Sequence, residues 1–363
     1  TRARPMKPLH IEQGVSLAPY TTLQLGGPAE HFARIEGRTQ LREALEWGRA
    51  HGLPVCVLGG GSNVVVSDAG VRGLVVWLAT RGVDFAPADP SRPDEQVLEV
   101  QAGESWDALV ERCVAAGLRG IECLSGIPGT VGAAPIQNIG AYGQELSECL
   151  QAVEVLDLTD LSTRWLPRAD CQLSYRSSRW KQQPGRELVL GVRISLHRGG
   201  PSHVRYAELQ NAVGSATADV AKVRAAVLTL RRGKSMLLDA ADPNSRSVGS
   251  FFTNPIVSPD LAERVLQTAL ARGLVADASA LPRYPQAAGR VKLSAAWLIE
   301  RAGTHKGERR GPVGVSSRHS LALVHHGGGT SAALLDLASE LQARVRNMFD
   351  VELEREPVLL GFD

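Results

Sequence analysis

The chain has 363 residues, which is long enough for two or three domains, and 44% of them are hydrophobic, enough to fill the cores of those domains. Its 40 basic and 38 acidic residues leave a net charge of +2, so composition gives no general reason to expect binding to nucleic acid or to a membrane surface. No apolar run approaches the roughly 20 residues that span a bilayer.

The first residues are basic, and the first predicted element is a helix. Thr1 to Pro5 lacks the apolar core of a signal peptide, so we expect a cytoplasmic protein. Residues 39–51 are expected to form a helix, because small or apolar side chains recur there at helical spacing. These side chains are Leu41, Ala44, Leu45 and Gly48.

A glycine loop then lies between two predicted strands, residues 55–58 and 64–66. In the dinucleotide fingerprint the glycines open a helix, whose N-terminus meets a pyrophosphate. Since a strand follows here, the loop Gly59-Gly60-Gly61-Ser62-Asn63 has a different use. It would have to hold a phosphate through backbone N–H groups alone.

The middle of the chain alternates further strands and helices. Residues 81–96 are polar and contain prolines, which indicates a loop or a domain seam. The elements expected after it are strands over 97–101, 152–158 and 188–196, a helix with a stripe of Trp106, Leu109, Val110 and Cys113, and a helix over about 217–232.

The last third begins after the turn cluster at residues 239–244, which we interpret as a boundary. The elements expected in it are helices over 261–272, 293–301 and 331–349 and a strand over 321–324. The last helix has an apolar face typical of a packed amphipathic helix.

Five cysteines are spread along the chain without a C-x-x-C pair, at Cys56, Cys113, Cys123, Cys149 and Cys171. This pattern predicts free, partly buried thiols and no metal site. The nine histidines likewise show no ligand spacing, and we interpret them as structural, with His319 as the exception.

Residues 126–143 form the most unusual segment, because nearly every side chain is small and yet the run is apolar. Glycine lets backbone N–H groups approach a ligand closely. A flexible linker is the alternative, but linkers favour polar residues. We therefore expect a backbone-built cradle for a large flat cofactor with phosphates.

Other motifs are ambiguous when taken singly. Gly233-Lys234-Ser235 ends like a phosphate loop, but Leu228 stands where the first glycine belongs, so Lys234 is either a single charge for an anion or a solvated helix end. Arg176 lies among hydroxyl side chains. This setting suits a guanidinium that binds a carboxylate, but the residue is also compatible with a plain surface charge. Glu356 is equally ambiguous between a functional carboxylate and a solvated surface charge.

In the segment 247–255, Ser250 precedes two phenylalanines, so the chain either packs awkwardly there or delivers a hydroxyl to an enclosed place.

Seven blocks, in family order over nearly the whole chain, resemble the bacterial UDP-N-acetylenolpyruvoylglucosamine reductases, the MurB-type flavoenzymes. The blocks are LGGGSN (58–63), IPGTVGAAPIQNIGAYG (127–143), SYRSS (174–178), VGSFFTNP (248–255), RYPQ (283–286), VKLSAAWLIERAG (291–303) and LEREPVLLG (353–361). The resemblance implies an α+β protein with a two-part FAD-binding region of the vanillyl-alcohol-oxidase or PCMH type and a third, α/β substrate-binding domain. The implied divisions are 1–83 with 355–363 returning to it, 84–237, and 238–354.

The resemblance implies FAD and NADPH as cofactors and a UDP-sugar enolpyruvyl ether as substrate. It implies no nucleic acid, membrane or metal, and we expect a monomer. The implied FAD-binding residues are Gly59, Gly60, Gly61, Ser62, Asn63, Pro128, Gly129, Thr130, Val131, Gly132, Ala133, Asn138, Ile139, Gly140, Ala141 and Val192.

The implied chemistry passes hydride from NADPH through FAD to the enolpyruvyl ether, which leaves a carbanion beside a carboxylate. Arg176 and Glu356, the latter as a hydrogen-bond donor with a raised pKa, match the family residues that stabilise this charge. Ser250 matches the family proton donor, a role in which position matters more than pKa.

Substrate contacts are implied at seven further positions, which are Tyr206, Lys234, Asn254, Tyr284, Lys292, Lys306 and His319. Tyr206 resembles the tyrosine with which one branch of the family covers its substrate. His319 stands where some relatives have glutamine. Thr253 and Ser177 replace a usual lysine and aspartate, which affects affinity rather than chemistry.

Two other functions are compatible with parts of the pattern. One is an FAD-dependent oxidase of the same fold, but the 127–143 cradle has neither the His nor the Cys with which many such oxidases hold flavin covalently. The other is a non-catalytic binder of flavin or nucleotide sugar, which would have no reason to retain Arg176, Ser250 and Glu356 together.

Overall fold

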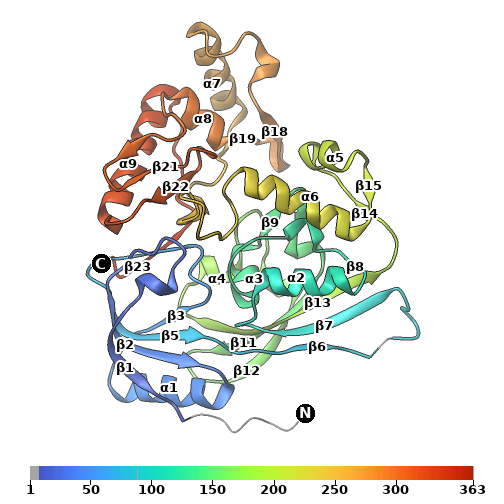
Figure 1. The fold of residues 1–363 in the computed structure, drawn as a ribbon, viewed down its shortest axis with the longest axis vertical. Helices are drawn as coiled ribbons and strands as arrows, with labels where there is room; N and C mark the ends of the chain where they lie inside the picture. Colours follow the sequence, from blue (N-terminus) through green and yellow to red (C-terminus); the bar gives the residue numbers. More distant parts are fainter. Residues whose placement is uncertain (1–7, 88, 363) are drawn as a thin grey trace. The chain divides into compact units, whose positions relative to one another are not determined.

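The computed structural model describes residues 8–87 and 89–362, and its chain folds into two compact units (Figure 1). Within the described residues, unit 1 holds 8–15, 29–61 and 71–237, and unit 2 holds 16–28, 62–70 and 238–362. The N-terminal residues on which the cytoplasmic expectation rests lie outside the described residues.

Unit 1 begins with a four-stranded sheet in the order β1-β2-β5-β3. Its strands are β1 (Ile11–Ser16), β2 (Pro28–Ile35), β3 (Val55–Leu58) and β5 (Val71–Leu78). Both β2 and β3 run parallel to β5. The connection between β2 and β3 is α1 (Arg38–Ala50), which buries the four side chains that the helical spacing predicted and is visible beside this sheet in Figure 1.

The second sheet of unit 1 is antiparallel, in the order β12-β11-β13-β7-β6, with β8 also paired to β13. Its strands are β6 (Val83–Phe85), β7 (Glu95–Gln101), β8 (Leu118–Arg119), β11 (Leu150–Asp157), β12 (Thr163–Pro167) and β13 (Glu187–Arg198). The interpretation of residues 81–96 as a loop or domain seam is wrong in part, because β6 within it pairs with β7. Three prolines in the connection obscure the short strand that precedes them.

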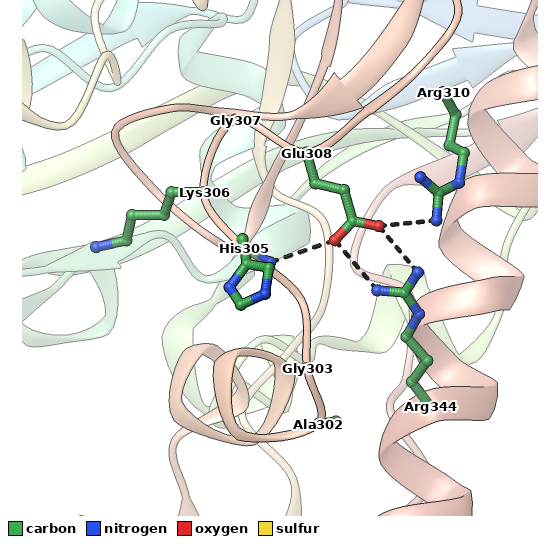
Figure 2. A pocket seen from close by; sticks show the side chains of 8 residues that line it. All are labelled: Ala302, Gly303, His305, Lys306, Gly307, Glu308, Arg310 and Arg344. Atoms are coloured by element: carbon green, nitrogen blue, oxygen red, sulfur yellow. Dashed lines mark hydrogen bonds and ion pairs between the residues drawn. The ribbon is translucent and has the colours of Figure 1, made fainter.

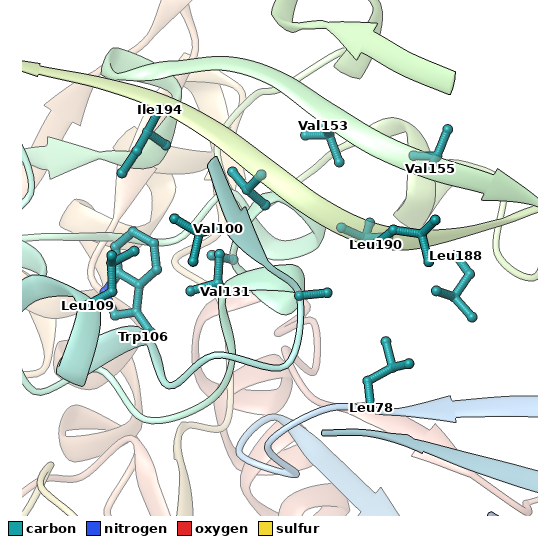
Figure 3. Packing of buried hydrophobic residues seen from close by; sticks show 14 of the residues in the cluster. Leu78, Val100, Trp106, Leu109, Val131, Val153, Val155, Leu188, Leu190 and Ile194 are labelled. Atoms are coloured by element: carbon teal, nitrogen blue, oxygen red, sulfur yellow. The ribbon is translucent and has the colours of Figure 1, made fainter. Parts of the chain in front are cut away.

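Unit 1 has further helices besides α1. They are α2 (Trp106–Ala115), α3 (Ala134–Gln137), α4 (Arg179–Gln182), α5 (Ala207–Val213) and α6 (Val220–Gly233). Of these, α2 packs on β8, and α6 packs on α2 and α5. Figure 3 shows Trp106 and Leu109 of α2 beside Val100 of β7 and Val131 of the glycine-rich segment, all of them buried. The helix expected from residue 217 begins at Val220, because the Asp219 side chain caps it.

Unit 2 has its own core and three small sheets. One sheet has the order β16-β22-β21-β20, one has the order β17-β19-β18, and β23 pairs with β4 in parallel. The strands are β4 (Val64–Val66), β16 (Ser247–Ser250), β17 (Ile256–Val257), β18 (Arg283–Pro285), β19 (Val291–Leu293), β20 (Arg309–Arg310), β21 (Val313–Val315), β22 (Ala322–His325) and β23 (Val358–Leu360). The helices are α7 (Pro259–Ala271), α8 (Ala295–Arg301) and α9 (Ser331–Phe349).

Short two-residue strands complete the fold in unit 1. They are β9 (Gly140–Ala141), β10 (Gln144–Glu145), β14 (Ser202–His203) and β15 (Thr217–Ala218).

Within the part of the chain that the structure describes, no helix has the length and apolarity needed to cross a bilayer. All five cysteines are free thiols, and only Cys56 is not fully buried.

Candidate active site

Two glycine-rich loops that are distant in the sequence lie against each other in unit 1. A Cβ atom added to Gly60 would lie 2.6 Å from the Cα of Gly129, and one added to Gly59 would lie 2.7 Å from Oγ1 of Thr130. Real Cβ atoms do not approach so closely, so only glycine fits at residue 60, where the neighbour is backbone, and a side chain at residue 59 would displace the Thr130 hydroxyl. The structure therefore brings together the two blocks in which cofactor-binding residues are expected.

The glycine-rich segment is firmly fixed in unit 1. The side chain of Val131 is 1% exposed, and its N–H group donates to the carbonyl of Glu104. The N–H group of Gly132 donates to the carbonyl of Ala102, whose Cβ leaves no space for a side chain at residue 132. A flexible linker makes no such contacts, so that alternative is excluded. The N–H groups of these two residues are engaged within the protein.

Two other predicted cofactor residues, Asn138 and Val192, have side chains that are engaged within the protein itself. The amide of Asn138 donates to the carbonyl of Ser174 at 2.9 Å and to Glu145 at 3.1 Å, and its oxygen accepts from the N–H of Ser147. Asn138 itself has a left-handed backbone, with φ of 40°. Val192 lies in the middle of β13 with its side chain fully buried. For both residues, a side-chain contact with a cofactor rests on the resemblance alone.

Arg176 lies at the tip of a tight turn that reaches this segment. Ser174 and Ser177 exchange two backbone hydrogen bonds of 3.1 Å across the turn, and Arg176 has φ of 51°. Its guanidinium donates to the carbonyl of Gly140 at 2.9 Å and to that of Asn138 at 3.4 Å. The structure thus places the predicted carboxylate-binding arginine beside the predicted cofactor cradle.

Lys234 and Tyr206 also meet in unit 1, through a third residue. The ring of Tyr142 makes an edge contact with that of Tyr206, at 5.7 Å between centroids, and Nζ of Lys234 lies 5.7 Å from the Tyr142 centroid. Lys234 also pairs with Glu208 at 2.6 Å. Burial raises the pKa of Tyr142 to about 12. The Tyr206 ring is 46% exposed.

Sequence reasoning missed two residues of this cluster, Tyr142 and Arg231. Tyr142 is the one large ring in the segment of small residues, and Arg231 precedes Lys234 by less than one helical turn. Burial lowers the pKa of Arg231, whose charge also interacts with Tyr142, Asp107 and Arg176. Its Nε atom is buried without a hydrogen-bond partner. A half-buried arginine with a buried Nε atom was not detectable from spacing, because arginine is usually exposed.

Ser250 and Glu356, distant in the sequence, are neighbours in unit 2. The N–H of Glu356 donates to the carbonyl of Phe251 at 2.9 Å, directly after Ser250. Both residues are half-buried. Asn63 lies at the same place, because its side chain donates to the carbonyl of Glu356 at 3.3 Å and its own carbonyl accepts from Val358.

The segment that carries Ser250 is strand β16, which is not among the strands expected from the sequence. Ser247 pairs with Val324 and Ser250 with Ala322, and the register shifts between the two pairs. Gly249 has φ of 75° at this irregularity, which is the position that a bulge leaves to glycine. The two phenylalanines that follow are buried in the core of unit 2.

Asn254 and His319 lie close to this strand in unit 2. The side-chain oxygen of Asn254 accepts from the N–H of Ala295 at 2.9 Å, at the start of α8. The ring Nδ1 of His319 accepts from the N–H of Leu321 at 3.3 Å, and the carbonyl of Leu321 accepts from Phe251. Both side chains therefore have structural partners near Ser250.

Of the other predicted substrate residues of unit 2, Tyr284 and Lys306 are exposed and Lys292 is half-buried. Tyr284 and Lys292 are paired across β18 and β19, and the lysine Nζ is 5.9 Å from the tyrosine centroid. Lys306 lines an open pocket of about 580 Å³ and pairs with Glu300 at 3.5 Å. Figure 2 shows it pointing away from the ion pairs of Glu308 with two arginines. The pocket residues are Ala302, Gly303, His305, Lys306, Gly307, Glu308, Arg310 and Arg344.

Comparison with known proteins identifies the family. Residues 242–360 match the C-terminal domain of UDP-N-acetylenolpyruvoylglucosamine reductase, and residues 29–161 match an FAD binding domain. The UDP-N-acetylenolpyruvoylglucosamine reductase of Thermobifida fusca is 47% identical over 354 residues, which cover 96% of this chain and 98% of the relative. That of Saccharopolyspora erythraea is 48% identical, with 96% and 95% covered.

The chain belongs to the UDP-N-acetylenolpyruvoylglucosamine reductase family. A crystal structure of UDP-N-acetylenolpyruvylglucosamine reductase from Thermus caldophilus is similar to the chain, with a TM-score of 0.66 and 27% identity over 97% of this chain and 100% of that one. Membership of the reductase family confirms the expected α+β class with an FAD-binding region. The roles of single residues, the domain boundaries and the tyrosine branch stay predictions.

Proposed function

We propose that this protein reduces the enolpyruvyl ether of UDP-N-acetylglucosamine to UDP-N-acetylmuramate, with NADPH as reductant and FAD as the bound cofactor. The reaction belongs to the synthesis of peptidoglycan precursors. The observation that carries the proposal is the identity of 47–48% to reductases of this name over 96% of the chain. The geometry within each unit supports roles for particular residues.

The glycine-rich region of unit 1 fits FAD. Gly59, Gly60 and Gly132 stand where a Cβ would collide with neighbouring atoms, so backbone rather than side chains forms this part of the molecule. Backbone can approach a diphosphate and a flat ring system closely. When bound, FAD supplies hydride transfer between NADPH and the enolpyruvyl carbon. Residues 59–61 and 128–141 would hold it in unit 1.

Arg176 is the proposed ligand of the substrate carboxylate. A guanidinium presents its donors in one plane, and the bonds to the carbonyls of Gly140 and Asn138 fix the orientation of that plane. Addition of hydride to the enolpyruvyl group leaves negative charge that spreads into the carboxylate. A fixed positive charge beside those oxygens stabilises the charge more than a mobile one, because no reorganisation is needed.

Ser250 is the proposed proton donor. Glu356, in its protonated form, is a proposed hydrogen-bond donor to the substrate carboxylate. The bond from the N–H of Glu356 to the carbonyl of Phe251 keeps the two side chains at neighbouring backbone positions in unit 2. The buried rings of Phe251 and Phe252 hold the strand that carries Ser250. A serine hydroxyl is a weak acid, but the enolate that it meets is a strong base, so a fixed position suffices.

The remaining proposals concern substrate contacts, the branch of the family, the domain division, the cellular location and the oligomeric state. Tyr206 and Lys234 in unit 1, with the unit 2 residues described above, are proposed contacts of the sugar, the diphosphate or NADPH. The presence of Tyr206 supports the proposal that the chain belongs to the branch with a substrate-covering tyrosine. The division into 1–83 with 355–363, 84–237 and 238–354 is likewise proposed, as are a cytoplasmic location and a monomeric state.

The test separates the two half-reactions of the Ser250→Ala variant. Anaerobic stopped-flow absorbance should show flavin reduction by NADPH within about twofold of wild type, because Ser250 has no role in that step. Reoxidation by the enolpyruvyl sugar nucleotide should slow at least ~100-fold, as expected for loss of a general acid. Equal slowing of both half-reactions would contradict the role of Ser250.

The same measurements test the function itself. Wild-type protein should bind a releasable yellow flavin and, under anaerobic conditions, consume more than one equivalent of NADPH per flavin only when the enolpyruvyl sugar nucleotide is present. An oxidase would instead consume oxygen in place of that substrate, and a non-catalytic binder would consume neither.

A further inference from the structure

The backbone of Arg176 is held in a conformation that arginine rarely adopts. Its φ of 51° lies in the left-handed region, at the third position of the turn from Ser174 to Ser177. A side chain with a Cβ is disfavoured there, and glycine or asparagine is the usual occupant. Such strain persists only where surrounding contacts hold it in place, and it gathers at functional sites.

A charged donor contacts the backbone of the strained residue. Nζ of Lys181 donates to the carbonyl oxygen of Arg176 at 3.0 Å. A hydrogen bond from a charged group is stronger than one between neutral groups. The ammonium of Lys181 therefore favours the peptide orientation in which this carbonyl faces α4, and that orientation goes with the left-handed conformation of Arg176.

Lys181 can act in this way because α4 is tied to the glycine-rich segment. Ser178 caps α4 by accepting from the N–H of Lys181, and its hydroxyl donates to the carbonyl of Ile136 at 2.7 Å. The Ser178 side chain is fully buried. The turn, the short helix and residues 136–140 therefore form one hydrogen-bonded assembly, in which the Arg176 guanidinium rests on the carbonyls of Asn138 and Gly140.

We propose that Lys181 is a positioning residue for reduction of the enolpyruvyl ether, acting through Arg176. It holds the Arg176 carbonyl, which keeps the residue left-handed and directs the guanidinium to one place for the substrate carboxylate. The inference rests on the proposed function, because it needs the carboxylate as the group that Arg176 binds. Lys181 itself does not touch the substrate.

The variant that tests this is Lys181→Met, which keeps the length of the side chain and removes the donor. Lys222→Met is its control, because Lys222 is an exposed lysine of the same unit, on α6. In anaerobic stopped-flow experiments, K181M should be reduced by NADPH within about twofold of wild type. Its reoxidation by the enolpyruvyl sugar nucleotide should be about 10- to 100-fold slower, since a misplacement of about 1 Å costs that much. K222M should match wild type in both.

A binding measurement provides a readout that does not depend on turnover. UDP-N-acetylmuramate carries the carboxylate, whereas UDP does not. K181M should bind UDP-N-acetylmuramate about tenfold more weakly than wild type and bind UDP equally well, as measured by calorimetric titration. Lys181→Arg, which restores a charged donor, should recover at least half of the lost affinity.

The outcomes distinguish this inference from the proposed function. Wild-type rates of flavin reoxidation in K181M overturn the inference and leave the proposed function intact. Equal loss of both half-reactions, with a lowered thermal unfolding temperature, also overturns it, because it shows a merely structural role. Failure of wild-type protein to reoxidise with the enolpyruvyl substrate overturns the proposed function.

Discussion

Glycine residues show how differently the same residue type is used in this chain. Gly60 has no space for a Cβ, because the backbone of Gly129 lies 2.6 Å from where that atom would be. Gly233, the last residue of α6, has nothing within 4 Å of the corresponding position. Gly60 lies in a glycine-rich motif and Gly233 in a charged one. Composition alone does not show which of the two glycines is packed against backbone.

We expect Gly60→Ala to destabilise unit 1 and to weaken FAD retention. Forcing a methyl group into closely packed backbone costs about 1–3 kcal/mol. Gly233→Ala is the matched control and should stabilise the protein by up to about 1 kcal/mol, because alanine favours helix more than glycine does. Urea denaturation and flavin release on dilution measure the two effects. Equal stability of G60A and wild type would contradict the packing argument.

The residues proposed for catalysis were detectable from the sequence, and those that surround them were not. Ser250 and Arg176 stand in motifs that resemble a family, so their chemistry could be inferred from order and type. Within unit 1, Lys181 bonds to the backbone of Arg176, and the charge of Arg231 interacts with Arg176 and with Tyr142. A half-buried arginine or a lysine that supports a backbone carbonyl leaves no periodic pattern, because each depends on segments that are distant or turn sharply.

At the scale of elements, α9 begins where two distant segments of unit 2 meet. The carboxylate of Asp68 accepts from the N–H groups of Ser331 and Ala332 at 2.8 and 2.9 Å, and Thr330 caps the N–H of Ala333. A carboxylate at a helix N-terminus satisfies donors that the helix leaves open and interacts favourably with the helix dipole.

Asp68→Ala should therefore lower the free energy of unfolding by about 1–2 kcal/mol, as loss of a helix cap does. The control is Asp336→Ala, which removes an exposed carboxylate from the body of the same helix and should change stability by less than about 0.5 kcal/mol. Chemical denaturation followed by circular dichroism measures both. If the two variants were equally stable, Asp68 would not be a cap of α9.

Elements with a strong period were predictable, and irregular ones were not. The helix expected over 331–349 has those bounds as α9. Strand β16 was not expected, because its sequence Ser-Val-Gly-Ser has neither alternation nor β-branched residues beyond Val248. It forms because β22 offers it a partner and because Gly249 permits the bulge.

At the scale of the whole molecule, the thiols are confined to unit 1. Burial raises the pKa of Cys113, Cys123 and Cys149 to about 12 and that of Cys56 and Cys171 to about 11. The unfolded chain ionises these thiols near their ordinary value, so above about pH 9 it loses protons before the folded chain does. The stability that the protonated thiols contribute is present below pH 9 and is lost as the pH rises toward 12.

We expect the free energy of unfolding to fall between pH 9 and 11, by up to about 1.4 kcal/mol per pH unit for each fully shifted thiol. Cys149→Ala removes one such group, so its stability should fall less steeply over this range than that of wild type. Urea denaturation at several pH values gives the slope of the free energy of unfolding against pH for each protein. The difference between the two slopes reports on Cys149, because the other titrating groups are the same in both. Identical slopes would contradict a raised pKa at Cys149.

The sequence by itself determined the family, the α+β class and the presence of two glycine-rich loops that are not a dinucleotide fingerprint. Those features depend on residue type and order along the chain, which local physics and resemblance can interpret. Only the tertiary structure decided that Gly60 packs on Gly129, that Glu356 bonds beside Ser250, and that Lys181 holds the backbone of Arg176. Each of these contacts joins segments through packing or a sharp turn, and their energies depend on distances that no periodic pattern encodes.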